Sequence, residues 1–298
     1  MTHPLYVSTW SLRDHLHRQA LPPAAWPALA AARGFDGIEI LDRQLAGCGA
    51  AAREALGRAL ARDALGVVVD IGCDLCRPEP EARQAQMDHV IRLLDLAAEL
   101  GAPCARITLG GQGISLQRLL YRRRGDAPCG PGSPRRWPGY LAHRLRRALP
   151  APAAAPALLA RARAALEALL PHAERRGVRL GIENHWGLSA RPGPILALVR
   201  ALDSPWLGTC PDFGNFPPGL DEADGLAQLL PEAVHVQAKA LSFNPAGEEP
   251  DIDFARCLAQ VAAAGYRGPL GVEYEGPGDG LAGCLAARDL IRRHLAGP

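Results

Sequence analysis

The chain has 298 residues, of which 48% are hydrophobic and 21% are charged, as expected for a globular protein with a large buried core. Thirty-three basic residues against 31 acidic ones give a formal net charge of +2, which disfavours nucleic acid and membrane surfaces as partners. No apolar stretch approaches the ~20 residues of a membrane helix, and the N-terminus lacks the pattern of a secretion signal. These features predict a cytoplasmic protein with a small-molecule partner.

Eight cysteines are spread along the chain, and several lie in apolar runs. This distribution indicates reduced, buried thiols rather than a disulfide framework. Cys73 and Cys76 have CxxC spacing, but no second pair completes a zinc site. We therefore expect neither redox nor zinc chemistry at this pair.

Short strand-like runs alternate with Ala-, Leu- and Arg-rich helical runs along the whole chain. The predicted strands are Leu5–Thr9, Gly37–Leu41, Val67–Ile71, Cys104–Leu109, Val178–Glu183, Gly208–Pro211, Ala233–Lys239 and Leu270–Glu275. Several of the helical runs between them are predicted to end at a glycine, namely Gly34, Gly66, Gly101, Gly177 and Gly265. Eight such units in 298 residues predict an α/β fold, a single (β/α)8 TIM barrel over residues 1–298.

Residues 110–156 are rich in Arg and Pro and form a predicted insertion after the fourth strand. The carboxyl end of that strand belongs to the face where barrel active sites lie. The segment is either a solvated excursion or a lid or subunit contact, which leaves a homo-oligomer open.

Four successive strands end in side chains that can bind a metal ion or move a proton. Glu183 ends the fifth strand, Asp212 follows the sixth, Lys239 ends the seventh and Glu273 lies in the eighth. Because the carboxyl ends of barrel strands converge, these groups should meet at one mouth. Carboxylates there repel one another unless a cation joins them. Three carboxylates and one neutral ligand favour Mn²⁺, Mg²⁺ or Co²⁺.

The seventh strand carries polar residues on one face. His235, Gln237 and Lys239 alternate with Val234 and Val236, so the three polar side chains point the same way. Such a barrel interior is costly unless these groups serve a site. Lys239 is also the only lysine in the chain, and it lies at the predicted mouth.

Four motifs together resemble the sugar phosphate isomerase/epimerase family of xylose-isomerase-like TIM barrels: Glu183-Asn-His, Pro211-Asp-Phe-Gly-Asn215, His235-Val-Gln-Ala-Lys239 and Gly271-Val-Glu-Tyr-Glu-Gly276. The resemblance implies one divalent metal ion bound by four residues, namely Glu183, Asp212, Gln237 and Glu273. It also implies that Glu183 and Glu273 are the catalytic pair. The expected substrate contacts are His185, Asn215 and Arg106, to which we add His235 and Lys239.

The ligand from the seventh strand stays open between two residues. Gln237 occupies the motif position where relatives usually carry a metal-binding His, and His235 is the rival. The two residues are about 6.6 Å apart along a strand, too far for equivalent ligation. We favour Gln237, with His235 beneath it. An amide oxygen favours Mn²⁺ or Mg²⁺, while Co²⁺ and Zn²⁺ remain open.

The implied activity is a sugar isomerase or epimerase that removes a proton next to a carbonyl through a metal-stabilised enediolate. Acidic residues in the loops after the last two strands disfavour a phosphate there, namely Glu248, Glu249, Asp251 and Asp279. We therefore expect a non-phosphorylated sugar, keto-sugar or inosose. Alternatives are a dehydratase or lyase on the same substrates, an AP-endonuclease-like phosphodiesterase, and a sugar-binding barrel without activity. Glu275 is expected to be secondary.

Overall fold

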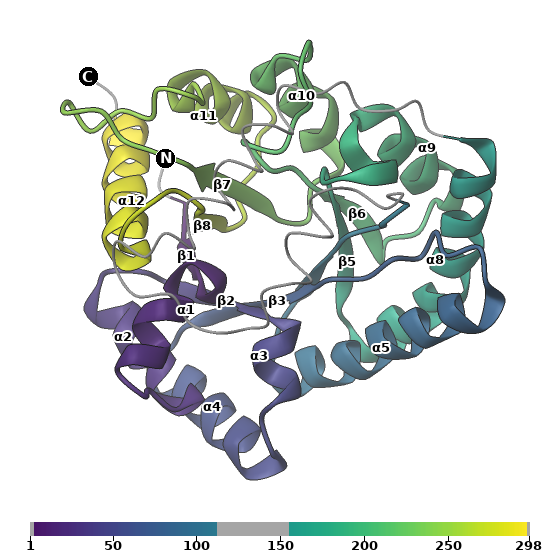
Figure 1. Cartoon of the computed structure of the whole chain (residues 1–298), viewed down its shortest axis with the longest axis horizontal. Coiled ribbons are helices and arrows are strands. Elements are labelled where there is room, and N and C mark those ends of the chain that lie inside the picture. Colours follow the sequence, from purple (N-terminus) through teal and green to yellow (C-terminus); the bar gives the residue numbers. More distant parts are fainter. Residues whose placement is uncertain (1–2, 112–154, 297–298) are drawn as a thin grey trace.

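The computed structural model describes residues 3–111 and 155–296. Within them, eight parallel strands form one sheet in the order β6-β5-β4-β3-β2-β1-β8-β7, surrounded by helices (Figure 1). The strands are β1 (Leu5–Ser8), β2 (Gly37–Leu41), β3 (Gly66–Ile71), β4 (Cys104–Ile107), β5 (Arg179–Glu183), β6 (Leu207–Cys210), β7 (Val236–Ala240) and β8 (Leu270–Tyr274). The predicted (β/α)8 barrel is thus confirmed.

The barrel closes between β6 and β7 through isolated bridges rather than a continuous ladder. Thr209 pairs with Ala233 and Asp212 with Gln237, both in parallel. Ala233 pairs with Thr209 only through an isolated bridge, so the continuous strand β7 begins at Val236 and not at the predicted Ala233. The second pairing holds the backbone of Asp212 beside Gln237, which fixes an acidic residue at the carboxyl end of the barrel.

Helices cover the outside of the barrel, and their apolar faces pack on the outward side chains of the strands. They are α1 (Thr9–Arg18), α2 (Trp26–Ala32), α3 (Asp42–Ala46), α4 (Ala50–Arg62), α5 (Pro80–Glu99), α8 (Pro156–Arg176), α9 (Pro192–Leu202), α10 (Glu222–Leu229), α11 (Phe254–Ala263) and α12 (Gly280–Ala296). In the described ranges, no helix is both long and apolar enough to cross a membrane. The predicted insertion at 110–156 lies between β4 and β5, and all but its ends falls outside the described residues.

The predicted helix-ending glycines are correct at four of five positions. Gly34, Gly101, Gly177 and Gly265 have φ between 65° and 76°, the left-handed conformation that glycine adopts without strain. Gly66 is the exception: Ala64 takes the left-handed conformation before it, at φ 52°. Gly66 instead begins β3, where a Cβ would lie 1.6 Å from the Tyr6 hydroxyl. This glycine is required by packing inside the barrel.

The cysteines of the described part of the chain are free thiols, as expected. Cys73 Sγ donates to the Thr108 carbonyl at 2.8 Å. Burial raises the pKa of the Cys76 thiol to about 12, so this group stays protonated and unreactive. The CxxC pair therefore packs a loop against its neighbours.

The strand register arranges the barrel interior in layers. Tyr6 lies beside Gly37 and fills the amino-terminal end. Farther along, Asp70 of β3 pairs with Arg106 of β4, and Lys239 of β7 lies opposite Glu273 of β8. Apolar packing at one end therefore gives way to charged side chains at the other.

Candidate active site

A cavity of about 420 Å³ opens at the carboxyl ends of the strands, within the size range of small-molecule sites. The charged residues that line it include Arg106, Glu183, Lys239 and Glu273, and its aromatic residues are Trp10, His185 and Trp186. The rings of His185 and Trp186 lie 4.6 Å apart, tilted by 31°. The cavity thus combines buried charges with flat apolar surfaces, a combination suited to a polyol.

Arg106 joins two carboxylates from different strands. Its Nε donates to Asp70 Oδ1 at 2.7 Å, and its Nη1 lies 2.6 Å from Glu183 Oε1. The Asn215 side-chain amide also donates to Glu183 Oε1, at 3.0 Å. Glu183 Oε2, by contrast, has no hydrogen-bond partner in the described part of the chain. Burial raises the pKa of Glu183 well above its usual range, against the lowering effect of Arg106.

Asp212 is fixed through both its backbone and its side chain. Asn184, the residue after β5, accepts a hydrogen bond from the Asp212 amide at 2.6 Å and donates to its carbonyl at 3.0 Å. Asp212 Oδ1 accepts from the Gly214 amide at 2.7 Å, and Oδ2 accepts from Asn215 at 2.8 Å. The Asn215 amide therefore bridges Glu183, the last residue of β5, and Asp212, which follows β6.

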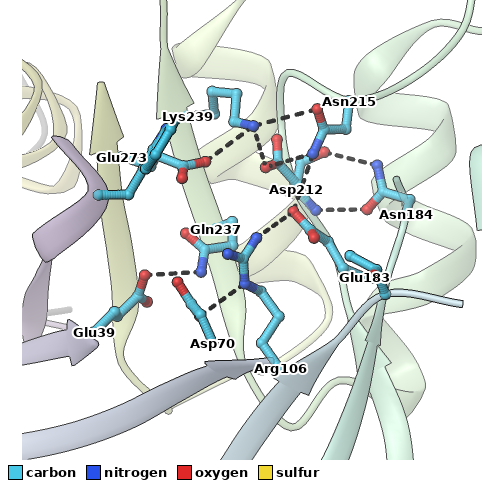
Figure 2. Close-up of polar contacts among 12 residues, drawn as sticks. Glu39, Asp70, Arg106, Glu183, Asn184, Asp212, Asn215, Gln237, Lys239 and Glu273 are labelled. Atoms are coloured by element: carbon cyan, nitrogen blue, oxygen red, sulfur yellow. Dashed lines mark hydrogen bonds and ion pairs between the residues drawn. The ribbon is translucent and has the colours of Figure 1, made fainter. Parts of the chain in front are cut away.

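Lys239 lies among acids from two segments, the loop after β6 and the β8 region (Figure 2). Its Nζ is 2.9 Å from Glu273 Oε2 and 3.3 Å from Asp212 Oδ2. A third carboxylate oxygen, Glu275 Oε2, is 3.4 Å away, and Nζ donates to Asn215 Oδ1 at 3.3 Å. Burial would lower the pKa of Lys239, but the carboxylates outweigh it and raise the pKa well above its usual range. The ammonium is therefore charged.

The two acids of the eighth strand region differ in exposure. The Glu273 side chain is 4% exposed and that of Glu275 is 20% exposed. Burial raises the pKa of Glu273 to about 7, although Lys239 opposes this effect. Glu275 Oε1 accepts from the Trp10 indole at 3.0 Å. Glu273 is thus the inner acid and Glu275 the outer one, as expected.

His235 and Gln237 lie deeper in the barrel and converge on Glu39 of β2. His235 Nε2 contacts Glu39 Oε1, and the Gln237 amide donates to Glu39 Oε2 at 2.8 Å. Gly271 makes this pairing possible, since a Cβ there would meet the oxygens of both Glu39 and Gln237. The structure does not bring His235 to the cavity, in contrast to the expected substrate contact. His235 precedes Lys239 by four residues, which corresponds to about 13 Å along an extended chain.

Sequence reasoning missed four residues of this network, namely Trp10, Glu39, Asp70 and Asn184. The signal for two of them was present. Glu39 lies between two isoleucines, and Asp70 follows three valines, so each is a charged residue in an otherwise apolar strand. Such a residue must find a partner inside the barrel.

The donor chemistry of the proposed metal ligands fits a hard divalent ion. Glu183 Oε2 and Gln237 Oε1 have no hydrogen-bond partner among the residues described, and the contact between Glu273 Oε2 and Lys239 lacks hydrogen-bond geometry despite its 2.9 Å separation. Buried oxygens left in this way are costly. Yet within residues 3–111 and 155–296, no group of three or more His, Cys, Asp or Glu is arranged to hold a metal. In the structure these carboxylates are paired instead with the cations Lys239 and Arg106.

Similar folds occur among solved structures. A structure of L-ribulose 3-epimerase has a TM-score of 0.70 at 18% identity, covering 99% of this chain and 95% of that chain. A xylose isomerase-like TIM barrel protein from Mycobacterium smegmatis, in complex with magnesium, has a TM-score of 0.68 at 19% identity, covering 99% and 97%. These likenesses show the same fold.

Two sequence comparisons also found matches. The C-glycoside deglycosidase alpha subunit of Arthrobacter globiformis is 32% identical over 75 residues, which make up 25% of this chain and 21% of that protein. The match therefore spans about a fifth of that relative. The family model described as xylose isomerase-like TIM barrel matches residues 27–294, nearly the whole chain. The chain therefore belongs to the xylose isomerase-like TIM barrel family.

Proposed function

We propose that this chain is a metal-dependent sugar isomerase or epimerase that moves a proton next to a carbonyl. The observation that carries the proposal is the placement of Glu183 and Glu273. The two buried acids line one cavity from β5 and β8, on either side of Asp212 (Figure 2). Burial raises the pKa of both carboxyls, as general acid–base catalysis near neutral pH requires. The likeness to an epimerase structure supports this class of reaction.

Glu183 is the proposed base. Because Arg106 and Asn215 fix its Oε1, the carboxylate is oriented to accept the proton from the carbon beside the carbonyl, whose bonding electrons move toward the carbonyl oxygen. Glu273 then returns a proton from the other side, which inverts the carbon and gives an epimer. Return to the neighbouring carbon on the same face would give the 1,2-isomer.

The proposed metal ligands are Glu183, Asp212, Gln237 and Glu273. When bound, a divalent ion would supply the positive charge that polarises the substrate carbonyl. An all-oxygen ligand set favours Mn²⁺ or Mg²⁺, and the magnesium complex of the Mycobacterium smegmatis protein supports the second. We prefer Gln237 to His235 because Gln237 is nearer the mouth; each of the two side chains has an unpartnered atom in the described part of the chain, Gln237 Oε1 and His235 Nδ1.

The proposed substrate contacts are Arg106, His185, Asn215 and Lys239. Arg106, His185 and Lys239 line the cavity directly, and Asn215 lies next to Lys239. Guanidinium, ammonium and amide groups donate hydrogen bonds to hydroxyl and carbonyl oxygens. They can therefore orient a polyol above the two acids.

Two carboxylates support a substrate without phosphate. Glu249, in the loop after β7, accepts from the amides of Leu241, Ser242 and Asp251 at 2.6 to 2.9 Å. Asp279 likewise accepts from the Ala282 amide at 2.9 Å at the start of α12. Phosphate binds such amides in other barrels, and here an acid of the chain itself occupies them.

The test uses the Mn²⁺-loaded protein in D₂O with ketoses, keto-glycosides and inososes, followed by NMR. We expect deuterium at one carbon beside the carbonyl, together with a new epimer or isomer. Glu183→Gln and Glu273→Gln should abolish the exchange. A product that has lost water would identify a dehydratase instead. Turnover without deuterium incorporation in any product would contradict the mechanism.

A further inference from the structure

The ammonium of Lys239 lies against two of the acids that we propose as metal ligands. Its Nζ contacts Asp212 Oδ2 and Glu273 Oε2, at 3.3 and 2.9 Å. A divalent ion bound by the same two carboxylates would therefore lie beside a positive charge. At such separations, two cations repel strongly in a buried site. The contacts shown and a bound metal ion are thus in conflict.

We propose that Lys239 is the counter-ion of the metal-free site: its ammonium joins Asp212 and Glu273 until a divalent ion replaces it, and then pairs with Glu275. The inference rests on the metal-binding part of the proposed function. It assigns a role to the only lysine of the chain and to the outer acid of the β8 region. It also predicts that metal binding works against an ion pair that is already formed.

The geometry provides a destination for the ammonium. Glu275 Oε2 is 3.4 Å from Nζ, and this side chain is 20% exposed against 4% for Glu273. Trp10 holds the other oxygen of Glu275 at 3.0 Å, which orients Oε2 toward Lys239. Nζ therefore has to shift outward by only a short distance to exchange its inner partners for the outer one.

The stem of Lys239 can stay in place during this exchange. Its Cγ and Cδ pack against Gly214, where an added Cβ would lie 3.1 Å from both atoms. Gly214 is held in turn by Asp212 Oδ1. A fixed stem with a short movable end allows the ammonium to shift without a change in the barrel.

Lysine suits this role better than arginine. An ammonium is a compact charge on a flexible stem, whereas a guanidinium is a planar fork that binds two partners rigidly. Arg106 shows the second behaviour, bridging Asp70 and Glu183. The chain otherwise uses arginine for its basic residues, 32 of the 33, so the one ammonium stands where a cation has to move.

The first test measures Mn²⁺ binding to the full-length, chelator-treated protein by calorimetry, without substrate. Lys239→Met should bind Mn²⁺ about tenfold more tightly than the wild type, because the competing charge is gone. The matched control is Arg18→Met, which removes a partly exposed cation paired with Asp279 and should leave the affinity unchanged. Metal-free Lys239→Met should also melt at a lower temperature, and Mn²⁺ should raise its Tm more than that of the wild type.

The second test needs no substitution at Lys239. Because the chain has a single lysine, untagged protein labelled with ¹³C-lysine gives one Cε signal, which can be followed as Mg²⁺ is added. We expect that signal to move. Glu275→Gln should change the chemical shift of the Lys239 Cε signal more in the Mg²⁺-loaded protein than in the metal-free protein. The reason is that Glu275 becomes the main partner of the ammonium only after the metal ion has displaced it from Asp212 and Glu273.

Two results would overturn the inference. One is a Lys239→Met protein that binds Mn²⁺ no more tightly than the wild type, including the case in which neither binds it. The other, decisive if that variant does not fold, is a lysine signal that Glu275→Gln affects equally with and without Mg²⁺. Deuterium exchange into substrate is measured separately, so failure of this inference and failure of the proposed activity are distinguishable. Only the absence of Mn²⁺ binding by the wild type would contradict the metal dependence of that activity as well.

Discussion

Arg106 Nη1 lies 2.6 Å from Glu183 Oε1, so a buried guanidinium fixes one oxygen of the proposed base and leaves the other one unused. The same guanidinium bonds to Asp70 through Nε. A planar guanidinium that bonds two carboxylates in this way fixes geometry as well as charge. The position of the base on β5 is therefore determined by Arg106 on the neighbouring strand β4, which is itself bonded to Asp70 on β3.

Replacing Arg106 by Met should destabilise the fold. The change leaves Asp70 and Glu183 buried without their cation, which typically costs about 3–5 kcal/mol of unfolding free energy. Arg106→Lys should recover part of the loss, because an ammonium cannot bond both acids with the same geometry. Urea denaturation of the metal-free proteins measures both. Arg18→Met, which breaks a pair at the surface, should cost less than about 1 kcal/mol; equal losses in all three variants would contradict this interpretation.

The acids of the β8 region should differ in their effect on catalysis. Glu273→Gln removes the inner acid and should reduce deuterium exchange into substrate by at least about 10²-fold, the usual contribution of a general acid–base group. Glu275→Gln should cost less than about tenfold at saturating Mn²⁺, because Glu275 contacts Lys239 and Trp10 at the outer edge. NMR exchange rates for the two variants decide between them. The opposite order would place the catalytic acid two residues further along.

The barrel was predictable from the sequence because its alternating pattern is local. Each strand carries its own apolar run, and helix-ending glycines mark most of the returns. Gly66 was misassigned because its reason is not local: the Tyr6 ring from another strand leaves no room for a side chain. Likewise, β7 begins late because Ala233 pairs separately with Thr209, which no pattern within the β7 segment indicates.

The site was predictable where an acid or lysine lies at the end of a strand. It was not predictable where it depends on contacts between side chains of different strands. Lys239 could be placed at the mouth from its position alone. Its simultaneous contacts with Asp212 and Glu273 depend on how β6, β7 and β8 align, which the sequence does not encode in any single segment. The pairing of His235 and Gln237 with Glu39 crosses the barrel from β7 to β2 and was missed for the same reason.

Removing Glu249 should expose a phosphate-binding position. Glu249→Ala leaves the amides of Leu241, Ser242 and Asp251 without their acceptor, which should cost about 1–3 kcal/mol of unfolding free energy. Millimolar phosphate should restore part of the Tm of this variant and leave the wild-type Tm unchanged. The control is Glu248→Ala, whose acid pairs with Arg293 at the surface and should have little effect. Phosphate stabilising the wild type equally would argue against a non-phosphorylated substrate.

Glu273 should make the metal-free protein less stable as the pH rises. Burial raises the pKa of this carboxyl from 4.5 to about 7 in the folded chain. Below about pH 4.5 both folded and unfolded chains hold the proton. Between about pH 4.5 and pH 7 only the folded chain does, so the stability contributed by this group is lost as the pH rises across that interval.

Other carboxyls such as Glu248 have a lowered pKa and act in the opposite direction, so the informative quantity is the difference in unfolding free energy between the wild type and Glu273→Gln. Urea unfolding in the presence of a chelator at pH 5 and pH 8 should show the wild type losing on the order of 1–3 kcal/mol relative to Glu273→Gln, since glutamine does not titrate. A difference between the two proteins that stays constant with pH, or that changes in favour of the wild type, would mean that Glu273 is already ionised in the folded chain at pH 5 and that Lys239 outweighs its burial.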